Sequence, residues 1–293
     1  MKKTALTLVF ILTLAFGADA QILWKVSGNG IERPSYLLGT HHIAPVAILD
    51  TLTGFTDALQ SVDKIYGELV MSDASSAASQ QKMAMAAMAP ADSTLSKVLT
   101  PAQMDSVTAV LRLYMGPQMD ASMFDAFRPA MVATLLGLTQ TQKEFPEFTG
   151  ATPIDAEVQN RAIALGKEIG SFETMDQQCA MLFGYPIAQQ AAELLETVRD
   201  DDYAMEMIRK LSRAYLNGDL NSILAIMEDP KMTTEESRDR ILNSRNAAWM
   251  KVIAGLLPAA SVLIAVGAGH LPGEKGLISL LRKNGYTVEP VRK

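Results

Sequence analysis

Short apolar runs alternate along this chain with stretches whose apolar residues recur at helical spacing. Residues 23–27 and 35–38 have the composition of two strands, and the Gly-Asn-Gly sequence after the first run predicts the turn between them. Residues 50–62 carry apolar side chains on one helical face, and residues 64–70 are apolar and aromatic enough for a third strand. This part of the chain therefore predicts strands that alternate with helices.

The second half of the chain resumes this alternation. A helix is predicted over residues 156–165 and a short strand over residues 168–172. The most apolar strand follows at residues 261–266, then a helix at residues 274–284 and a last strand at residues 286–289. Strands separated by helices predict an α/β fold with a mostly parallel central sheet and flanking helices.

Two long helical stretches interrupt this α/β pattern. Residues 72–91 are rich in Ala, Ser and Met, and several helices are predicted after them. Met side chains that fill a helical core are the simpler interpretation, and a Met-rich surface for varied apolar ligands is the alternative. We therefore predict a single α/β domain over residues 21–293, with large helical insertions at about 72–150 and 180–255.

Residues 1–20 have the pattern of a secretory signal peptide. Two lysines precede the apolar residues 4–16, and an Ala-Asp-Ala sequence ends at residue 20, so Gln21 is predicted to begin the mature chain. No later run reaches the roughly 18 apolar residues of a transmembrane segment, because a proline and a glycine interrupt the closest one, residues 254–268. We expect an exported protein, periplasmic or secreted.

Composition argues against a nucleic-acid-binding surface and against any feature that needs several cysteines. A formal net charge of −6 with 6% aromatic residues argues against a nucleic-acid-binding surface, which needs a basic patch. Cys179 is the only cysteine, so the chain can form neither an intrachain disulfide nor a zinc site built on cysteines. The apolar helical surroundings of Cys179 predict that it is a small buried hydrophobic residue.

Two of the three histidines end the same short motif at opposite ends of the chain. One strand-like run leads into Gly-Thr-His-His at residues 39–42, and another leads into Gly-Ala-Gly-His at residues 267–270. Both Gly-x-x-His motifs fall at the carboxyl end of a predicted strand, the edge where open α/β sheets bind ligands. We therefore expect His42 and His270 to meet at one site, with His41 as a neighbour that points differently.

Two glutamates and a helical Arg-Asn pair complete the set of candidates. Glu68 interrupts an apolar strand near its end, where an unpartnered carboxylate is costly to bury, and this favours a role as an acid or a ligand. Glu173 follows the predicted strand of residues 168–172, and it is equally well interpreted as the cap of the next helix. Arg245 and Asn246 are candidates to supply a cation and an amide, although an exposed helical Arg is the ordinary interpretation.

Two imidazoles with one or two carboxylates make a ligand set for a divalent metal ion. Such sets leave positions open for water and substrate, and they discriminate weakly among Mn, Zn and Co. We predict His42, His270 and Glu68 as the metal ligands. The metal would lower the pKa of its bound water and polarise a substrate carbonyl, while a glutamate accepts the proton. A single histidine after a glycine loop is usually structural, but the pair together with Glu68 favours function.

Several segments together resemble the TraB/PrgY/GumN family, which includes the Tiki metalloproteases. The segments that carry the resemblance are residues 23–28 and 35–42, Gly166-Lys167 before Glu173-Thr174, Arg245-Asn246 before Trp249, residues 266–273 and residues 285–288. The resemblance implies the ChaN/erythromycin-esterase-like fold, an α/β core with helical additions. It also implies metal-dependent hydrolysis centred on His42, Glu68 and His270. Secondary positions of the family motifs fall on Glu173, Arg245 and Asn246.

These observations predict an exported α/β metal-dependent hydrolase. A peptide bond is the favoured target, so the expected partner is a peptide or protein substrate. The alternative is a non-catalytic protein that binds a peptide, a metal or haem in the same cleft. A hydrolase turns its substrate over, whereas a binding protein shows affinity without turnover.

Overall fold

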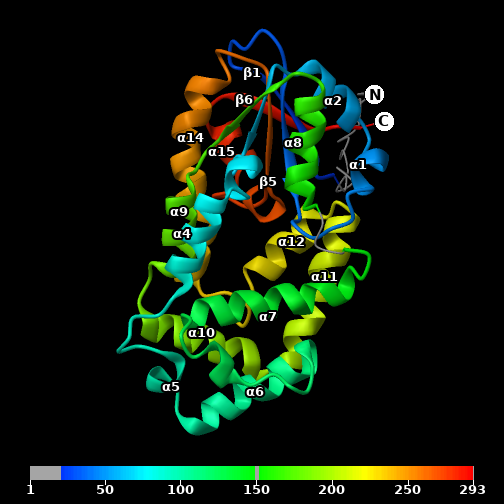
Figure 1. Ribbon diagram of the computed structural model, residues 1–293. Coiled ribbons are helices and arrows are strands. Elements are labelled where there is room, and N and C mark those ends of the chain that lie inside the picture. The colour runs from blue at the N-terminus through cyan, green and yellow to red at the C-terminus, as the bar shows by residue number, and fades with distance from the viewer. Residues whose placement is uncertain (1–20, 149–151, 293) are drawn as a thin grey trace, which may run out of the picture.

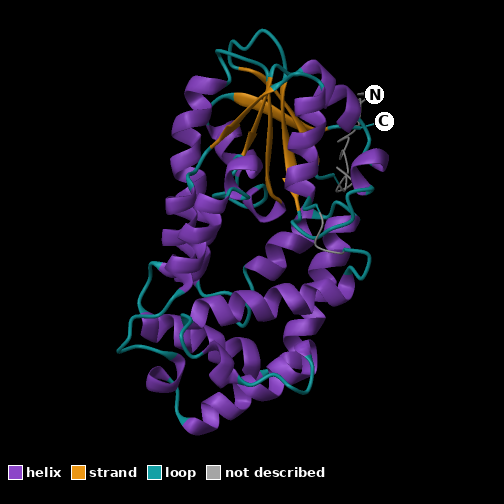
Figure 2. Cartoon of the chain, in the orientation of Figure 1, coloured by secondary structure: helices purple, strands orange, loops and turns teal. Residues whose placement is uncertain are grey.

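The computed structural model describes residues 21–148 and 152–292, so the predicted signal peptide lies outside the described part of the chain. Within that part, six strands form one sheet in the order β4-β3-β5-β2-β1-β6. They are β1 (Leu23–Gly28), β2 (Ser35–Thr40), β3 (Lys64–Gly67), β4 (Glu168–Ser171), β5 (Val262–Gly267) and β6 (Tyr286–Pro290). Figure 2 shows this sheet at one end of the molecule, with helices beside it and a larger helical part at the other end.

The sheet is mixed, which corrects the expectation of a mostly parallel one. β4, β3, β5 and β2 are parallel neighbours, whereas β1 is antiparallel to both β2 and β6. The reason is the short connection between β1 and β2, because a tight turn can join only antiparallel neighbours. In that turn Gly28, Asn29 and Gly30 have positive φ angles of 78°, 49° and 80°. The α/β class itself is confirmed.

The central strand β5 is buried on both faces. Residues 262–266 are at most 4% exposed. Figure 1 shows α14 (Ser244–Leu256) on one side of the sheet and α8 (Ile154–Ala164) on the other. Trp249 of α14 and Val158 of α8 belong to the same apolar core as β5. A strand covered in this way has no solvent face, which explains its uninterrupted apolar sequence.

Shorter elements complete the α/β part. They are α1 (Ile48–Thr51), α2 (Phe55–Ser61), the 3-10 turn η3 (Ala268–His270) and α15 (Leu277–Lys283). The single helix predicted over residues 50–62 is therefore two helices. Leu52, in an extended conformation, ends the first helix, and Gly54, with a left-handed φ of 76°, precedes the first residue of the second.

The helical insertions lie beyond the carboxyl ends of the parallel strands (Figure 1). The first contains α3 (Met71–Ala74), α4 (Ala77–Ala87), α5 (Leu95–Val98), α6 (Pro101–Met115), the 3-10 turn η1 (Ala121–Phe124) and α7 (Pro129–Glu144). The second contains α9 (Met175–Phe183), α10 (Ile187–Arg199), α11 (Asp201–Leu216), α12 (Leu220–Met227), α13 (Glu235–Arg238) and the π-helical turn η2 (Asp239–Asn243) before α14. Both insertions contribute to a second apolar core that includes Leu111, Leu136 and Leu194.

Methionines of the first insertion divide between this core and the surface. Met104, Met115 and Met119 pack against the second core, so the helical-core interpretation is confirmed for them. Met85 and Met123 are 68% and 61% exposed, so the helical-core interpretation is wrong for these two residues.

Two further predictions can be compared with the described residues. Cys179 is buried, as its apolar surroundings predict. Among the described residues, no helix has both the length and the apolar character that crossing a membrane requires.

Candidate functional site

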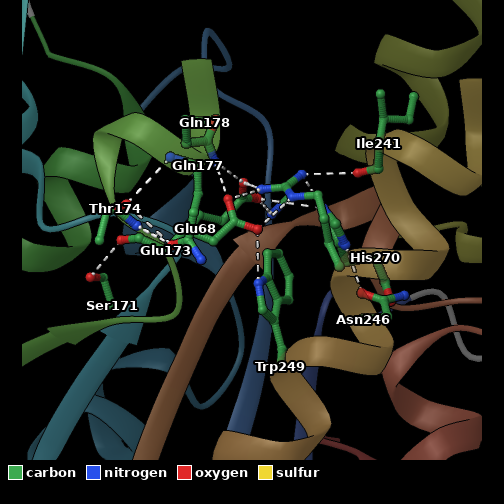
Figure 3. Close-up of polar contacts among 12 residues, drawn as sticks. Glu68, Ser171, Glu173, Thr174, Gln177, Gln178, Ile241, Asn246, Trp249 and His270 are labelled. Atoms are coloured by element: carbon green, nitrogen blue, oxygen red, sulfur yellow. Dashed lines mark hydrogen bonds and ion pairs between the residues drawn. The ribbon is translucent and has the colours of Figure 1, made fainter. Parts of the chain in front are cut away.

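The predicted site residues come from four loops at the carboxyl edge of the sheet and from the start of α14. His42 follows β2, Glu68 follows β3, Glu173 follows β4, His270 ends η3 after β5, and Arg245 and Asn246 lie in the first turn of α14. Because parallel strands end at the same edge, residues more than 200 positions apart reach one region. Figure 3 shows the side chains of Glu68, Glu173, Asn246 and His270 converging there.

The Arg245 guanidinium lies at the centre of this cluster. Its Nε donates to Glu173 Oε1 at 2.7 Å, and its Nη2 donates to Glu173 Oε2 at 3.0 Å and to Glu68 Oε2. Its Nη1 donates to the Ile241 carbonyl at 2.9 Å and contacts His270 Nε2 at 3.1 Å. The side chain is only 11% exposed, so the interpretation of Arg245 as an exposed helical residue is wrong. The preceding π-helical turn carries Ile241, and such turns are frequent at functional sites.

Both oxygens of the Glu68 carboxylate have partners. Oε1 accepts from the Gly267 backbone N–H at 2.9 Å and lies 3.7 Å from His270 Nε2, while Oε2 pairs with Arg245. Burial opposes the charged form, but the charge of His270 in its protonated form, together with those of Arg245 and His42, outweighs it and lowers the pKa of Glu68 to about 2. Glu68 is therefore an anion in a largely buried place.

The backbone around Glu68 is fixed by its neighbours. β3 ends at Gly67, earlier than the predicted strand of residues 64–70, so Glu68 begins the loop. Buried Gln159 of α8 donates to the Leu69 carbonyl at 2.8 Å and accepts from the Met71 N–H at 2.9 Å. The Glu68 carbonyl accepts from the Glu173 N–H at 3.0 Å, which joins the two glutamate loops directly.

Glu173 does not cap α9, since the cap is Thr174, whose hydroxyl accepts from the Gln177 N–H. The Glu173 carboxylate accepts from Arg245, from Trp249 Nε1 at 2.9 Å and from Gln178 Nε2 at 2.7 Å. With both oxygens engaged and the side chain 8% exposed, Glu173 positions Arg245 and Trp249.

Asn246 orients the buried His270 ring. His270 Nδ1 lies 2.7 Å from Asn246 Oδ1, and Asn246 Nδ2 donates to the carbonyls of His270 and Lys275 at 3.2 and 2.9 Å. The two carbonyls fix the amide, so its oxygen faces the ring and Nδ1 carries the proton. Nε2 then faces Arg245 and Glu68. Burial lowers the pKa of His270 to about 4, which makes the imidazole neutral.

His42 is held in a different way, by Asp155. His42 Nδ1 lies 2.6 Å from Asp155 Oδ2, and Asp155 Oδ1 accepts from the Thr40 hydroxyl at 2.6 Å. The His42 side chain is 70% exposed, and the Asp155 charge and hydrogen bond raise its pKa to about 9. No hydrogen bond joins His42 directly to Glu68, Arg245 or His270, yet it is near enough for its charge to affect the pKa of His270.

The sequence reasoning missed Asp155. A signal was available: Asp155 lies in the first turn of α8, and α8 is the helix that precedes strand β4. A helix that precedes a parallel strand runs opposite to it, so its first turn lies at the carboxyl edge of the sheet. An acidic residue there is a candidate partner for any cation or imidazole at that edge.

His41 takes no part in this polar cluster. Its ring packs against Phe145 and Tyr215, with centroid distances of 5.3 Å to each. Burial lowers the pKa of His41 to about 4. The two adjacent histidines therefore face different surroundings.

The contacts divide the candidates into a connected group and one neighbour. Glu68, Glu173, Arg245, Asn246 and His270 are linked by direct contacts, and His42 with Asp155 lies beside them. Throughout the described residues, no three His, Cys, Asp or Glu side chains are arranged so that they could hold one metal ion. Two of the predicted ligands approach each other, with 3.7 Å between Glu68 Oε1 and His270 Nε2.

Comparison with known proteins places the chain in a family and finds distant relatives. The model of the TraB/PrgY/gumN family matches residues 22–290. The chain is 24% identical to Metalloprotease TIKI2 and 23% identical to Metalloprotease TIKI1 of Danio rerio, and 22% identical to Metalloprotease TIKI1 of Homo sapiens. Each alignment covers 91% of this chain but only 60%, 62% and 61% of the relative, so the chain spans about three fifths of their length. No solved structure matches the chain significantly.

Replacing Arg245 with methionine is expected to lower the free energy of unfolding by about 3–5 kcal/mol, because it leaves Glu68 and Glu173 buried without their cation. Arg199→Met is the matched control: Arg199 is 67% exposed and pairs with Glu196 at the surface, so its loss is expected to change the free energy by less than about 1 kcal/mol. Urea denaturation of both variants measures the difference. Equal effects would contradict a buried ion cluster.

Replacing Asp155 with asparagine is expected to lower the pKa of His42 from about 9 towards 6.5. Since the folded pKa exceeds the unfolded one, the pair stabilises the fold fully below pH 6.5, and this contribution is lost as pH rises through about 9. NMR titration of the His42 ring checks the shift. Asp176→Asn, at an exposed ion pair with Lys82, is the control. An unchanged His42 pKa in Asp155→Asn would show that Asp155 does not hold the ring.

Proposed function

We propose that this chain, which belongs to the TraB/PrgY/gumN family, is an exported hydrolase that uses a divalent metal ion to cleave a peptide or protein substrate. The observation that carries the proposal is the approach of anionic Glu68 to the Nε2 of a neutral, oriented His270 at the carboxyl edge of the sheet. The distant relatives named metalloproteases support the same class of reaction. Export rests on the signal pattern of residues 1–20.

Three residues carry the donor atoms that a divalent metal ion uses, although in the described structure they are not arranged around one point. In both histidines Nδ1 is engaged, by Asp155 for His42 and by Asn246 for His270. This second contact fixes the ring and directs Nε2 towards a ligand, as is usual for metal-bound histidines. Glu68 adds a carboxylate, so His42, His270 and Glu68 are the proposed ligands for Mn, Zn or Co.

Arg245 contacts the same donors that the proposal assigns to the metal. It donates to His270 Nε2 and to Glu68, and one nitrogen lone pair cannot serve a guanidinium and a metal ion together. Binding therefore requires Arg245 to release His270. Its bonds to Glu173 can persist, because they use Nε and Nη2, whereas the contact with His270 uses Nη1.

The remaining roles follow from these contacts. When bound, the ion would supply Lewis-acid polarisation of the scissile carbonyl and a more acidic water. Glu68 is the proposed proton acceptor, since its Oε1 lies beside His270 Nε2, whereas Glu173 is bonded to Arg245 and Trp249. Arg245 presents a cation to the negative charge that develops on the carbonyl oxygen. Asn246 keeps the Nδ1 proton on His270 and thereby leaves Nε2 as the donor atom.

The test combines metal content with cleavage of a peptide library by protein purified without chelator. We expect about one divalent ion per chain and a fall in kcat/KM of at least about a thousandfold in His42→Ala, Glu68→Gln and His270→Ala, because ligands of one site act as a unit. His41→Ala is the control, since His41 packs against aromatic rings, and it is expected to retain most of the activity.

Thermal midpoints of all four variants separate loss of function from loss of folding. Full activity in His42→Ala or His270→Ala with metal still bound would contradict the proposal. Affinity for a peptide, a metal or haem without any turnover would favour the alternative of a non-catalytic binding protein.

A further inference from the structure

A pocket of about 550 Å³ lies between α9 and α14, directly against the ion cluster. Arg245 and Glu173 line it, and so does Trp249, whose ring lies 4.4 Å from the His270 ring between centroids. Phe172 stacks on Trp249 at 5.3 Å with an interplanar angle of 22°. The volume falls within the range of about 300–1,000 Å³ that is typical of ligand pockets. The pocket is thus continuous with the proposed site of chemistry.

Most of the surface that this pocket offers to a ligand is apolar. Phe172, Met181, Ala248 and Val252 contribute hydrocarbon or aromatic surface from two elements and the loop before α9, and Trp249 lines the wall although it is only 1% exposed. A flexible methionine adapts to side chains of different shape. Ala248 is exposed and small, so the pocket is open beside it. A larger side chain at this position of α14 would narrow the pocket.

The charged groups along the wall already have partners in the protein. Arg240 pairs with Glu193 at 3.2 Å, and its guanidinium lies 3.6 Å above the Tyr185 ring. Glu173 pairs with Arg245, which also pairs with Glu68. A charged group that entered the pocket would therefore lose its hydration and would find no unpaired opposite charge to offset that loss. An apolar group has no such hydration to lose.

We propose that this pocket is a substrate subsite that holds one large uncharged apolar side chain, Phe, Leu or Met, of the peptide that the site cleaves. The inference rests on the proposed function and names the substrate class for it. The occupant follows from continuity, because Glu173, Arg245 and Trp249 belong both to the pocket and to the polar cluster. A residue held there therefore places its own backbone beside Arg245.

The first experiment measures binding alone, in the exported protein with chelator present. The chain has two tryptophans, so Trp24→Phe leaves Trp249 as the only source of tryptophan fluorescence. N-acetyl-phenylalaninamide is expected to change this emission and to bind about 10–100-fold more tightly than N-acetyl-glycinamide, the ratio that burying one large apolar side chain gives. N-acetyl-aspartamide is expected to bind no better than the glycine compound.

Neighbouring alanines on α14 provide a matched pair of variants. Both Ala247 and Ala248 are exposed, but only Ala248 lines the pocket. Ala248→Phe is expected to weaken binding of the phenylalanine compound by about tenfold or more, and Ala247→Phe to leave it unchanged. In a peptide library, Ala248→Phe is expected to lower the ratio of kcat/KM for Phe over Ala, at one fixed position from the cut, by the same factor.

The outcomes distinguish failure of the pocket from failure of the proposed function. Cleavage with no apolar preference at any position, or equal binding of all three compounds, would overturn the subsite while leaving the hydrolase intact. An equal effect of Ala247→Phe and Ala248→Phe would also overturn the subsite. Selective binding that Ala248→Phe abolishes, in a protein that cleaves no peptide, would support the pocket and refute the hydrolase.

Discussion

One buried arginine between two buried glutamates is the interaction on which the rest of this site depends. Arg245 bonds to Glu68 and Glu173, which lie in the loops that follow the neighbouring parallel strands β3 and β4. Two carboxylates brought together in a largely dry place repel each other and are costly to desolvate. The guanidinium offsets both penalties because its planar fork reaches both carboxylates at once. The same contacts fix α14 against the edge of the sheet.

Fixing α14 also determines the state of His270. Asn246 is the next residue along the helix, and it can meet the His270 ring only if Arg245 holds the helix in this position. Trp249, one turn later, bonds to Glu173 and packs against the same imidazole. Three residues of one helical face thus connect the carboxylates, the histidine and the apolar pocket. His42 depends on a separate support, the Asp155 carboxylate at the start of α8.

The sequence was sufficient where local pattern and physical cost agree. The apolar run of β5 and the Gly-x-x-His endings placed His42 and His270 at one edge of an α/β sheet, and the burial of Glu68 in an apolar stretch indicated a partner. It was insufficient where the outcome depended on tertiary contacts. The pairing of β1 with β6, the burial of Arg245 and the pairing of Asp155 with His42 all arise between segments distant in the chain, so a local sequence pattern does not predict them.

The central claim is that His42, Glu68 and His270 bind one metal ion together. A crystal structure of the protein grown with Mn, with anomalous diffraction data, tests it most directly. The account predicts a single strong anomalous peak about 2.0–2.4 Å from Nε2 of both histidines and from a Glu68 oxygen, with Arg245 Nη1 withdrawn from His270 and its Nε still bonded to Glu173. A peak elsewhere, or no peak with Arg245 still on His270, would contradict it.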